Sequence, residues 1–417
     1  MSRLEELIQT LCPDGVEFGK LGGLGDFYGG LTGKTKSDFQ NGNSKFISYM
    51  NVYKNPAIDI GSADFVKVSA GERQNSVQYG DILFTGSSET PEECGISSVM
   101  VNPTDEMYYL NSFCIGFRLN NPGILNPQFS KHLFRSAELR KQINRTANGV
   151  TRFNVSKQKL SKVIIAIPPL PIQEEIVRIL DSFTALEAEL EKELEARTKQ
   201  YEYYRDALLN FDPESLQSHS LRPTRPTRLN HLIQTLCPDG VEYEDLKNLA
   251  TISRGVRVVR SQLTEKGEFP VYQNSLTPMG FFEESNCTAN SAFIISAGAA
   301  GDIGFCTVDF WAADDCFFFT DHERLHNKFL FYSILCQQKF LYSQVRRASV
   351  PRLARTVVEQ LRIPVPPLPV QEEIVSILDR FEALVGDLKS GLPAEIALRR
   401  KQYEYYRDQL LTFQPLP

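Results

Sequence analysis

The sequence repeats itself, and the repeat limits the architectures that the chain can adopt. Three segments of the 417 residues recur roughly 200 positions further on, with eleven of twelve, thirteen of seventeen and twelve of fifteen residues identical. The matching pairs are 7–18 and 232–243, 167–183 and 365–381, and 197–211 and 399–413. A period this long indicates a duplicated domain, because solenoid repeats have periods of about 20–50 residues.

The recurring segments form a frame around two inserts, residues 19–166 and 244–364. The inserts show little similarity to each other, and the first is 27 residues longer. A frame that is nearly the same in both halves suggests one shared partner or one symmetric core, and different inserts suggest two different targets. Duplication followed by unequal drift is the alternative, but drift alone gives no reason for sparing the frame.

The second and third frame segments predict long helices. Pro168, Pro169 and Pro171 form an extended lead-in, because proline disfavours the helical region at the residue before it. Apolar residues then follow at spacings of three and four, which is a helical stripe. The stripe consists of Ile176, Ile179, Leu180, Phe183, Leu186, Leu190 and Leu194 in the first copy, and Ile374, Ile377, Leu378, Phe381, Leu384 and Leu388 in the second. Two such helices, each roughly 60 Å long, are expected to pack antiparallel.

The second copy of the frame departs from the first by four extra residues, and this stretch contains Gly391 and Pro393. A proline inside a helix costs about 3 kcal/mol. We therefore expect a kink, or a break into two helices, near 390–394.

The inserts predict mixed α/β domains. Residues 45–53, 80–86 and 291–298 are β-like runs, whereas 326–347 is helical. The expected fold class is α+β, with two mixed α/β domains separated by two long antiparallel, coiled-coil-like helices and an internal pseudo-twofold duplication. The predicted boundaries are a first domain at 1–166, a helical region at 167–212, a Pro/Ser/Thr-rich linker at 213–230, a second domain at 231–364 and a second helical region at 365–417.

Composition argues against secretion and membrane spanning. No apolar run approaches the roughly 18 residues of a membrane span, and the first ten residues are too polar for a signal peptide. Eight cysteines without a C-x-x-C pair and five scattered histidines make neither a disulfide framework nor a metal site. We expect a cytoplasmic protein with reduced, mostly buried thiols and no metal.

Three strings come close to catalytic motifs and fail on spacing. Residues 29–35 (GGLTGKT) have the first glycine of a P-loop one position out of place. Residues 126–129 (NPQF) lack the second proline of an amino-methyltransferase motif, and the acidic and lysine residues of 238–247 stand too close together for a nuclease. The sequence thus predicts no catalytic residues, and residues 237–240 (CPDG) are better explained as a helix stop and turn.

Charge is unevenly distributed. The net charge is -6, but the acidic residues concentrate in the helical frame. Residues 131–162 carry nine Lys/Arg against one acid, 346–362 carry five Arg against one Glu, and three Arg lie within 254–260. Anionic partners respond to local potential, so nucleic acid is a compatible partner despite the net charge.

The repeated segments resemble those of a known family, the specificity (S) subunits of type I restriction–modification systems. The resemblance rests on PPLPIQEEIV and PPLPVQEEIV closing the inserts, KQYEYYRDALLNF and KQYEYYRDQLLTF ending the helices, and LCPDGVEF and LCPDGVEY opening each half. Segments of both inserts are similar to target recognition domains. The resemblance covers essentially the whole chain.

The resemblance implies a non-catalytic subunit of an adenine-N6 DNA methyltransferase and type I restriction endonuclease complex. Each target recognition domain would read one half of a bipartite, asymmetric site in double-stranded DNA. The long helices would set the unread spacer and dock two methyltransferase subunits, and restriction subunits would join through them. S-adenosylmethionine, ATP and Mg are expected on those partner subunits, and no cofactor in this chain.

Candidate site residues follow from the basic clusters and from the repeated frame. The DNA-binding candidates are Lys34, Lys36, Arg145, Arg152, Lys157, Arg254, Arg257, Arg260, Arg346, Arg347, Arg352 and Arg355. The partner-binding candidates are Gln173, Glu174, Tyr201, Tyr204, Arg205, Gln371, Glu372, Tyr403, Tyr406 and Arg407. Arg152 and Arg352 lie 16 and 14 residues before Pro168 and Pro366, which makes them the strongest pair. The alternative for a single arginine is a solvated charge, and for a frame tyrosine it is core packing.

Three polar residues, Gln273, Asn274 and Asn290, are weaker candidates for reading bases, since a structural role is more common for such side chains. Two other functions stay open. A stand-alone DNA enzyme would need an unusual active site. A coiled-coil scaffold that binds no nucleic acid predicts that the two inserts share no basic surface.

Overall fold

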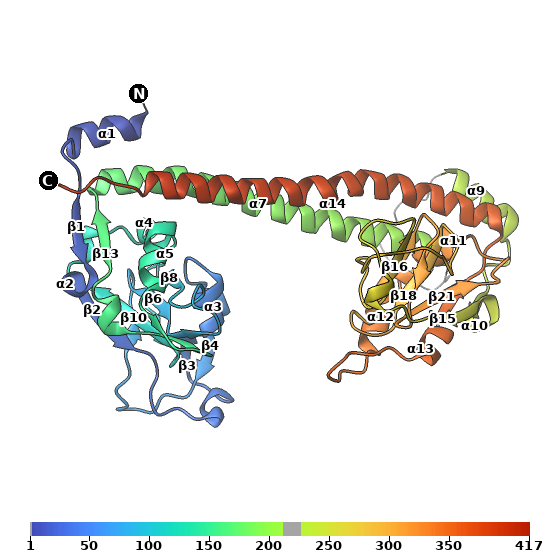
Figure 1. Cartoon of the computed structure of the whole chain (residues 1–417), viewed down its shortest axis with the longest axis horizontal. Coiled ribbons are helices and arrows are strands. Elements are labelled where there is room, and N and C mark those ends of the chain that lie inside the picture. Colours follow the sequence, from blue (N-terminus) through green and yellow to red (C-terminus); the bar gives the residue numbers. More distant parts are fainter. Residues whose placement is uncertain (1, 212–226) are drawn as a thin grey trace. The chain divides into compact units, whose positions relative to one another are not determined.

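The computed structural model describes residues 2–211 and 227–417, which divide into two compact units. Unit 1 comprises Met1–Glu191 and Ala394–Pro417, and unit 2 comprises Lys192–Pro393. Each unit combines mainly antiparallel sheets with helices, so the expected α+β class is confirmed (Figure 1).

Unit 1 is built on a four-stranded antiparallel sheet in the order β2-β10-β6-β8. These strands are β2 (Gly25–Gly29), β6 (Ile82–Thr85), β8 (Ser97–Val99) and β10 (Cys114–Leu119). Helices α4 (Pro127–Leu133) and α5 (Ala137–Asn144) belong to the same hydrophobic core as the sheet. The predicted strand at 80–86 is therefore confirmed as β6, a central strand buried along its length.

A second sheet in unit 1 has the order β4-β3-β9-β5. Its strands are β3 (Ser44–Ile47), β4 (Asp64–Val66), β5 (Ser76–Val77) and β9 (Tyr108–Leu110). The expected strand at 45–53 is wrong beyond Ile47, because Ser48 caps helix α3 (Tyr49–Lys54) by accepting a hydrogen bond from the Asn51 amide. Serine at such a position commonly starts a helix.

Unit 2 has the same sheet order, β15-β21-β18-β19. These strands are β15 (Thr251–Arg254), β18 (Ser291–Ile295), β19 (Ile303–Cys306) and β21 (Cys316–Thr320), and the helices are α11 (Asn327–Leu335) and α12 (Gln338–Ser343). A smaller sheet contains β16 (Phe269–Tyr272), β17 (Phe281–Phe282) and β20 (Trp311–Ala312). The two inserts therefore share a topology that their sequences do not reveal. The strand expected at 291–298 is found as β18, whereas the helix expected at 326–347 is divided into α11 and α12 and ends at Ser343.

Shorter elements also recur in the two units. They are α1 (Arg3–Leu11) and α9 (Thr227–Leu236), β1 (Glu17–Lys20) paired with β13 (Ile164–Ile167) and β14 (Tyr243–Asp245) paired with β22 (Arg362–Pro364), α2 (Leu21–Leu24) and α10 (Leu246–Leu249), and α6 (Lys157–Leu160) and α13 (Arg355–Glu359). Single 3-10 turns occur at η1 (Lys36–Phe39), η2 (Ile60–Ser62), η3 (Pro122–Ile124) and η4 (Arg260–Gln262). Helix α9 begins inside the linker expected at 213–230, whose residues 213–226 lie outside the described part of the chain.

The turn expected after each first frame helix is present. Helices α1 and α9 stop before Cys12 and Cys237, and the glycines that follow, Gly15 and Gly240, have φ of 117° and 96°. A positive φ suits glycine because it lacks a Cβ atom. All eight cysteines are free, and seven are buried.

Two long helices, α7 (Leu170–Leu209) and α14 (Leu368–Leu410), contribute residues to both units. In unit 1, Phe183 of α7 stacks on Tyr406 of α14, and Glu187 pairs with Arg400. The α14 partner number falls as the α7 number rises, which confirms the expected antiparallel packing.

Helix α14 runs without interruption through Pro393, so the expected break near 390–394 is wrong (Figure 1). The proline side chain is exposed, and a Cβ added at Gly391 would meet open space. The carbonyl that loses its helical partner can therefore be solvated, which lowers the cost of the proline. Among the described residues, none of the helices combines the length and apolar character that crossing a membrane requires.

Candidate nucleic-acid interface

A basic hairpin follows helices α4 and α5 in the chain of unit 1. Strands β11 (Ala147–Asn148) and β12 (Phe153–Val155) pair with each other, and β12 also pairs with β7 (Ser87–Ser88), just after the central strand β6. Gly149 starts the tip with a φ of 139°. This arrangement ties the tip residues 149–152 to the end of the central sheet on one side and leaves the other side exposed.

Unit 2 carries a hairpin at the corresponding place. Arg346 and Arg352 exchange two backbone hydrogen bonds of 2.9 and 3.1 Å, and Arg352 also bridges to Ala297. Ala297 lies two residues after β18, as Ser87 lies two residues after β6. Arg152 and Arg352 therefore lie in equivalent hairpins but not at equivalent positions. Asn154 pairs with Ser87 as Arg352 pairs with Ala297, so Arg352 aligns with Asn154 and Arg152 lies two residues earlier, at the tip.

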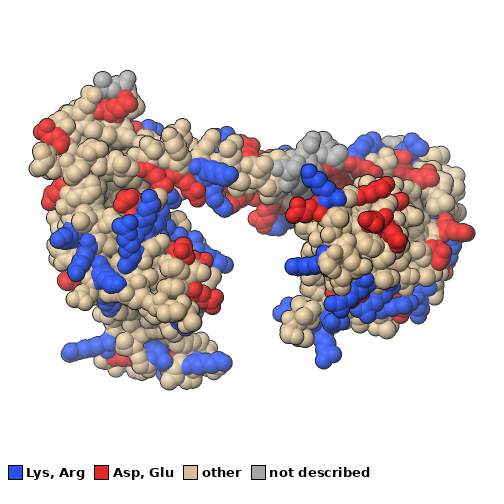
Figure 2. Space-filling model, viewed as in Figure 1, with Lys and Arg blue, Asp and Glu red and all other residues tan. Residues whose placement is uncertain are grey.

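Exposed basic side chains surround both hairpins. They are Arg145, Arg152, Lys157 and Lys159 in unit 1, and Arg346, Arg347, Arg352 and Arg355 in unit 2. Figure 2 shows Lys and Arg gathered over the lower part of unit 2 as drawn. A scaffold that binds no nucleic acid predicts no basic surface common to the two inserts, so these hairpins count against that alternative.

The other basic candidates differ in how far they are engaged. Arg257 and Arg260 are exposed beside η4, and Lys36 is exposed at the start of η1. Arg254 donates through Nε to the Asp314 carbonyl at 2.6 Å, and Arg355 donates to Glu359 at 2.8 Å. Both remain more than half exposed and can exchange these contacts for a phosphate.

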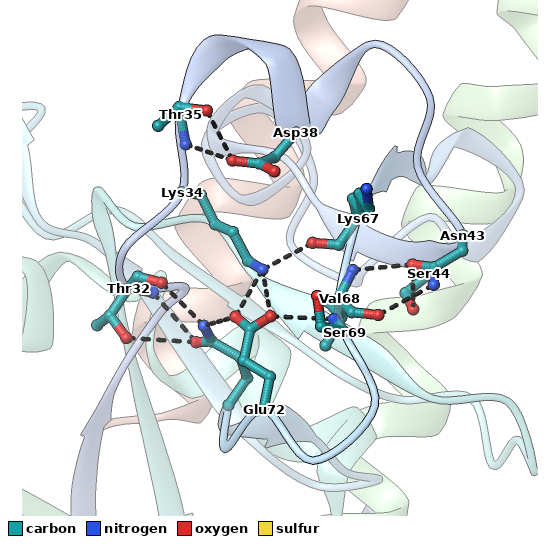
Figure 3. Close-up of polar contacts among 11 residues, drawn as sticks. Thr32, Lys34, Thr35, Asp38, Asn43, Ser44, Lys67, Val68, Ser69 and Glu72 are labelled. Carbon is teal, nitrogen blue, oxygen red and sulfur yellow. Dashed lines mark hydrogen bonds and ion pairs between the residues drawn. The ribbon is translucent and has the colours of Figure 1, made fainter.

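Lys34 is engaged within unit 1, and little of its side chain reaches solvent. Its Nζ donates to a Glu72 carboxylate oxygen and to the Lys67 carbonyl, each at 2.7 Å, and its side chain is 8% exposed (Figure 3). Glu72 also accepts from Gln74 and from the Ser69 amide. The hydrogen bond from Lys34 is the main cause that lowers the pKa of Glu72 to about 2. We therefore withdraw Lys34 from the DNA candidates, since its charge is used to close a loop.

A pocket opens beside the hairpin of unit 1. It is lined by Tyr49, Met50, Tyr53, Ser87, Ser88, Glu89, Glu93, Phe113, Thr151 and Arg152. The Arg152 guanidinium lies 5.9 Å from the Phe113 ring centroid and donates a long hydrogen bond of 3.3 Å to Ser87. Sequence reasoning missed Glu93, and its one available signal was a carboxylate in the loop directly after a central strand.

The weaker polar candidates in unit 2 separate by their contacts. Gln273 donates to Asp314 at 3.4 Å, and the Asn290 carbonyl accepts from Asn327 at 2.8 Å. Asn274 is exposed, and its backbone carbonyl accepts from Ala299 in the loop that contacts the hairpin. Asn274 and Asn290 are thus both exposed and engaged through their backbone carbonyls, whereas Gln273 uses its side chain.

Comparison with known proteins decides the family. The model of the type I restriction modification DNA specificity domain matches residues 13–199 and again residues 238–398. The chain belongs to the family of type I restriction–modification DNA specificity subunits. It is non-catalytic as this family is, which removes the stand-alone enzyme from the alternatives.

Several specificity subunits are similar over much of this chain. A putative type I specificity subunit of Mycoplasma pneumoniae is 32% identical over 264 residues, which cover 61% of this chain and 98% of that protein. The specificity subunit of a type I restriction enzyme of Escherichia coli is 32% identical over 275 residues, or 62% of this chain and 65% of that protein.

Two solved structures have the same fold. The S subunit from M. genitalium aligns with a TM-score of 0.51 and 16% identity, over 95% of this chain and 96% of that chain. A chain from an analysis of assembly and conformational transition in a type I restriction–modification system aligns with a TM-score of 0.57 and 17% identity, over 96% and 98% of the two chains.

In this specificity subunit the two frame glutamines have identical buried positions. Gln173 accepts from the Asn126 amide at 2.8 Å and donates to the Ile124 and Pro168 carbonyls, and its side chain is fully buried. Gln371 makes the same three contacts in unit 2, with the amide of His326 and the carbonyls of Arg324 and Pro366. Both amides join a helix to its recognition domain, so neither is accessible to another subunit.

The remaining partner candidates fall into buried and exposed groups. Tyr201 and Arg205 are 6% and 8% exposed, and Tyr403 shares a hydrogen bond of 2.8 Å with His132. Those three side chains pack inside their units. Tyr204 and Arg407 are half-buried, so part of each side chain is also packed. The exposed candidates are Glu174, Glu372 and Tyr406, to which the structure adds Tyr203 and Tyr405.

Proposed function

We propose that this specificity subunit reads a bipartite, asymmetric DNA site, with one recognition domain contacting each half. The observation that carries the proposal is the pair of equivalent basic hairpins, which present Arg152 in unit 1 and Arg352 in unit 2. Inserts of one topology but different sequence fit two readers of different half-sites.

Basic side chains of the hairpins would supply most of the affinity through phosphate contacts. Each lysine or arginine that neutralises a phosphate releases counterions, so binding falls steeply with salt. Sequence preference would come from the few side chains that reach base edges. Lys36, Arg257 and Arg260 fit the first role because they are exposed and lie on turns.

The long helices would set the spacer between the half-sites. Helix α7 has 40 residues, which gives a length of about 60 Å. One turn of DNA is about 34 Å. A spacer of several unread base pairs therefore agrees with the helix length.

The repeated frame would dock two copies of one methyltransferase subunit. Glu174 and Glu372 are exposed at identical places in the two copies, as are Tyr203 and Tyr405. S-adenosylmethionine would bind those subunits, and ATP and Mg the restriction subunits that join through them. This chain would supply recognition and geometry only.

Methylated-adenine mapping across a genome tests the proposal, with the full chain co-expressed with its cognate methyltransferase subunits. The wild type should give a split motif. Arg152→Ala should weaken or relax one half of it and Arg352→Ala the other, whereas Lys192→Ala, on an exposed helix position, should leave it unchanged. Both substitutions acting on the same half, or neither acting, would contradict one domain per half-site.

A further inference from the structure

Beside the unit 1 hairpin, the pocket holds a carboxylate fixed in position. The Glu93 carboxylate accepts from the Tyr53 hydroxyl at 2.7 Å and from the Ser88 hydroxyl at 3.3 Å. The bond from Tyr53 is the main cause that holds the pKa of Glu93 below its ordinary value. Glu93 is therefore ionised at neutral pH and acts only as a hydrogen-bond acceptor.

The loop that carries Glu93 is itself clamped. Arg140 of α5 donates to the carbonyls of Glu92 at 2.9 Å and Cys94 at 2.8 Å, and also to the Gly95 carbonyl. Burial lowers the pKa of Arg140 to about 10, so it stays charged at neutral pH. One guanidinium therefore binds three carbonyls of the loop. Because the loop is already ordered, little conformational entropy is lost when Glu93 contacts a ligand.

The aromatic wall of the pocket is also anchored. Tyr49 and Tyr53 stack one helical turn apart with planes 16° apart, and the Tyr49 hydroxyl donates to the Ser87 carbonyl at 2.8 Å. On the other side the Gly86 amide donates to the Phe113 carbonyl at 2.7 Å. Only glycine permits this close approach, because a Cβ atom at position 86 would clash with the Phe113 carbonyl oxygen. The resulting hydrogen bond keeps Phe113 close to Arg152.

Arg152 keeps most of its donors available. Among the residues that the structure describes, its guanidinium hydrogen-bonds to Ser87, over a long distance of 3.3 Å. A guanidinium has five N–H donors in a planar fork, so at least three can face a ligand. The pocket thus presents a set of donors beside a fixed acceptor.

We propose that Glu93 and Arg152 read one G·C base pair through its major-groove edge, an inference that rests on the proposed function. Cytosine offers the N4 amine as donor, and guanine offers O6 and N7 as acceptors. Glu93 would accept from the cytosine amine, and Arg152 would donate to both guanine acceptors. An adenine facing Glu93 also offers an amine, N6, but its partner thymine offers Arg152 only one acceptor, O4, so an A·T pair loses the bidentate contact. A phosphate would be repelled by the carboxylate.

Unit 2 has no equivalent of the Glu93 loop. In unit 1 the chain passes from β7 to β8 through residues 89–96, whereas in unit 2 only 298–302 separate Ala297 from β19. The short loop of unit 2 lies against Asn274 and carries an aspartate in place of a glutamate, Asp302, whose carboxylate accepts from the Tyr342 hydroxyl at 2.7 Å. A change at Glu93 should therefore alter the first half-site and leave the second as it is.

Glu93→Gln tests the proposal in the full chain co-expressed with its methyltransferase subunits. Glutamine keeps an acceptor for Tyr53 but also presents a donor. We expect a fixed G·C position in the first half-site of the wild type and a loss of preference there of roughly tenfold or more in the variant. Glu92→Gln, one residue away and outside the pocket lining, is the matched control and should leave the motif unchanged.

Modified DNA distinguishes major-groove reading from other contacts. Replacing the guanine by 7-deazaguanine removes N7 and should weaken binding of the purified complex at least several-fold, whereas inosine keeps the major-groove edge and should not. Arg152→Lys should retain binding to random DNA while losing the preference, because lysine cannot donate in a fork. Melting curves of both variants check that they fold.

The outcomes separate the two levels of the argument. A motif without a fixed G·C pair in the first half, a motif unchanged by Glu93→Gln, or sensitivity to inosine instead of 7-deazaguanine would each overturn the reading by Glu93 and Arg152. A wild-type complex that gives no split motif at all would overturn the proposed function itself.

Discussion

Tyr204 stacks on Phe381, with ring centroids 5.5 Å apart and ring planes 14° apart. The same pair recurs in unit 1 with the partners exchanged between the frame copies, where Phe183 stacks on Tyr406 at 5.3 Å and 25°. Each copy of the frame therefore supplies one phenylalanine and one tyrosine. The phenylalanine of each copy stacks on the tyrosine of the other copy.

Removing one of these rings should destabilise one unit. Tyr204→Ala deletes a half-buried ring and its aromatic contact, and we expect a loss of roughly 2 kcal/mol in the free energy of unfolding of unit 2. Chemical denaturation followed by amide hydrogen exchange measures this loss and assigns it to a unit. Tyr405→Ala removes a ring that is 62% exposed and should cost little. Equal costs for the two would contradict a structural role for the stack.

The buried frame glutamines predict a larger effect. Gln371→Leu keeps much of the side-chain volume but leaves the His326 amide and two carbonyls without a partner, and each such group costs about 1–3 kcal/mol. Unfolding by urea should show a loss of roughly 3 kcal/mol or more, with a matching loss for Gln173→Leu. Glu372→Gln, on the exposed side of the same helix turn, is the control. A stable Gln371→Leu variant would mean that water reaches those groups.

Lys34 and Glu72 predict an acid-sensitive loop. Because the folded pKa of Glu72 is lowered from 4.5 to about 2, its contribution to stability is complete above pH 4.5 and is lost as pH falls toward 2. Hydrogen exchange of residues 32–74 should speed up over that range. Lys34→Met should reduce the acid dependence, with the remainder due to the hydrogen bonds from Gln74 and the Ser69 amide, and should leave the salt slope of DNA binding unchanged. Lys36→Ala should reduce that slope by about 1 if Lys36 contacts a phosphate.

His132 gives unit 1 a pH-dependent stability. Its Nε2 lies 2.8 Å from Asp181 Oδ1 and its Nδ1 2.8 Å from the Tyr403 hydroxyl. Burial is the main cause that lowers its pKa. The folded state then binds its proton less readily than the unfolded state, so stability is complete above about pH 6.5 and falls below it. His132→Gln should flatten denaturation midpoints measured between pH 7 and 5.5. Tyr332 occupies the matching place in unit 2 and donates to Asp379 and Glu382.

Features that depend on local pattern could be predicted from the sequence. The helical stripes of α7 and α14 and the glycine turns at Gly15 and Gly240 follow from spacing within short segments. The basic hairpins of Arg152 and Arg352 also follow from the sequence, although the structure places the two arginines two positions out of register. Features that depend on distant partners could not. The partner of Lys34 is Glu72, 38 residues further along the chain, so no local pattern reveals that the Lys34 charge is paired. Glu93 becomes a fixed acceptor only when the fold brings α3 and β7 together around it.

Two expectations failed for different physical reasons. The run 45–53 is β-like throughout, but the Ser48 cap starts α3 in its second half. Pro393 is unfavourable in a helix, but α14 continues through it at an exposed position, where solvent can reach the carbonyl that lacks its helical partner. The common topology of the inserts was also hidden, since a sheet core requires only apolar side chains of suitable size and many sequences supply them.

The split composition of unit 1 has a consequence for biosynthesis. Val16 exchanges backbone hydrogen bonds with Gln414 and Leu416, and Tyr403 contacts His132, so this unit needs residues from 394 onward. Unit 2 is one continuous stretch of chain, Lys192–Pro393. At about 5–20 residues per second on the ribosome, the first recognition domain waits for the second to be made. The part of the protein that is translated first is therefore the last to be completed, and a ribosome that stalls in the final helix leaves it without its closing contacts.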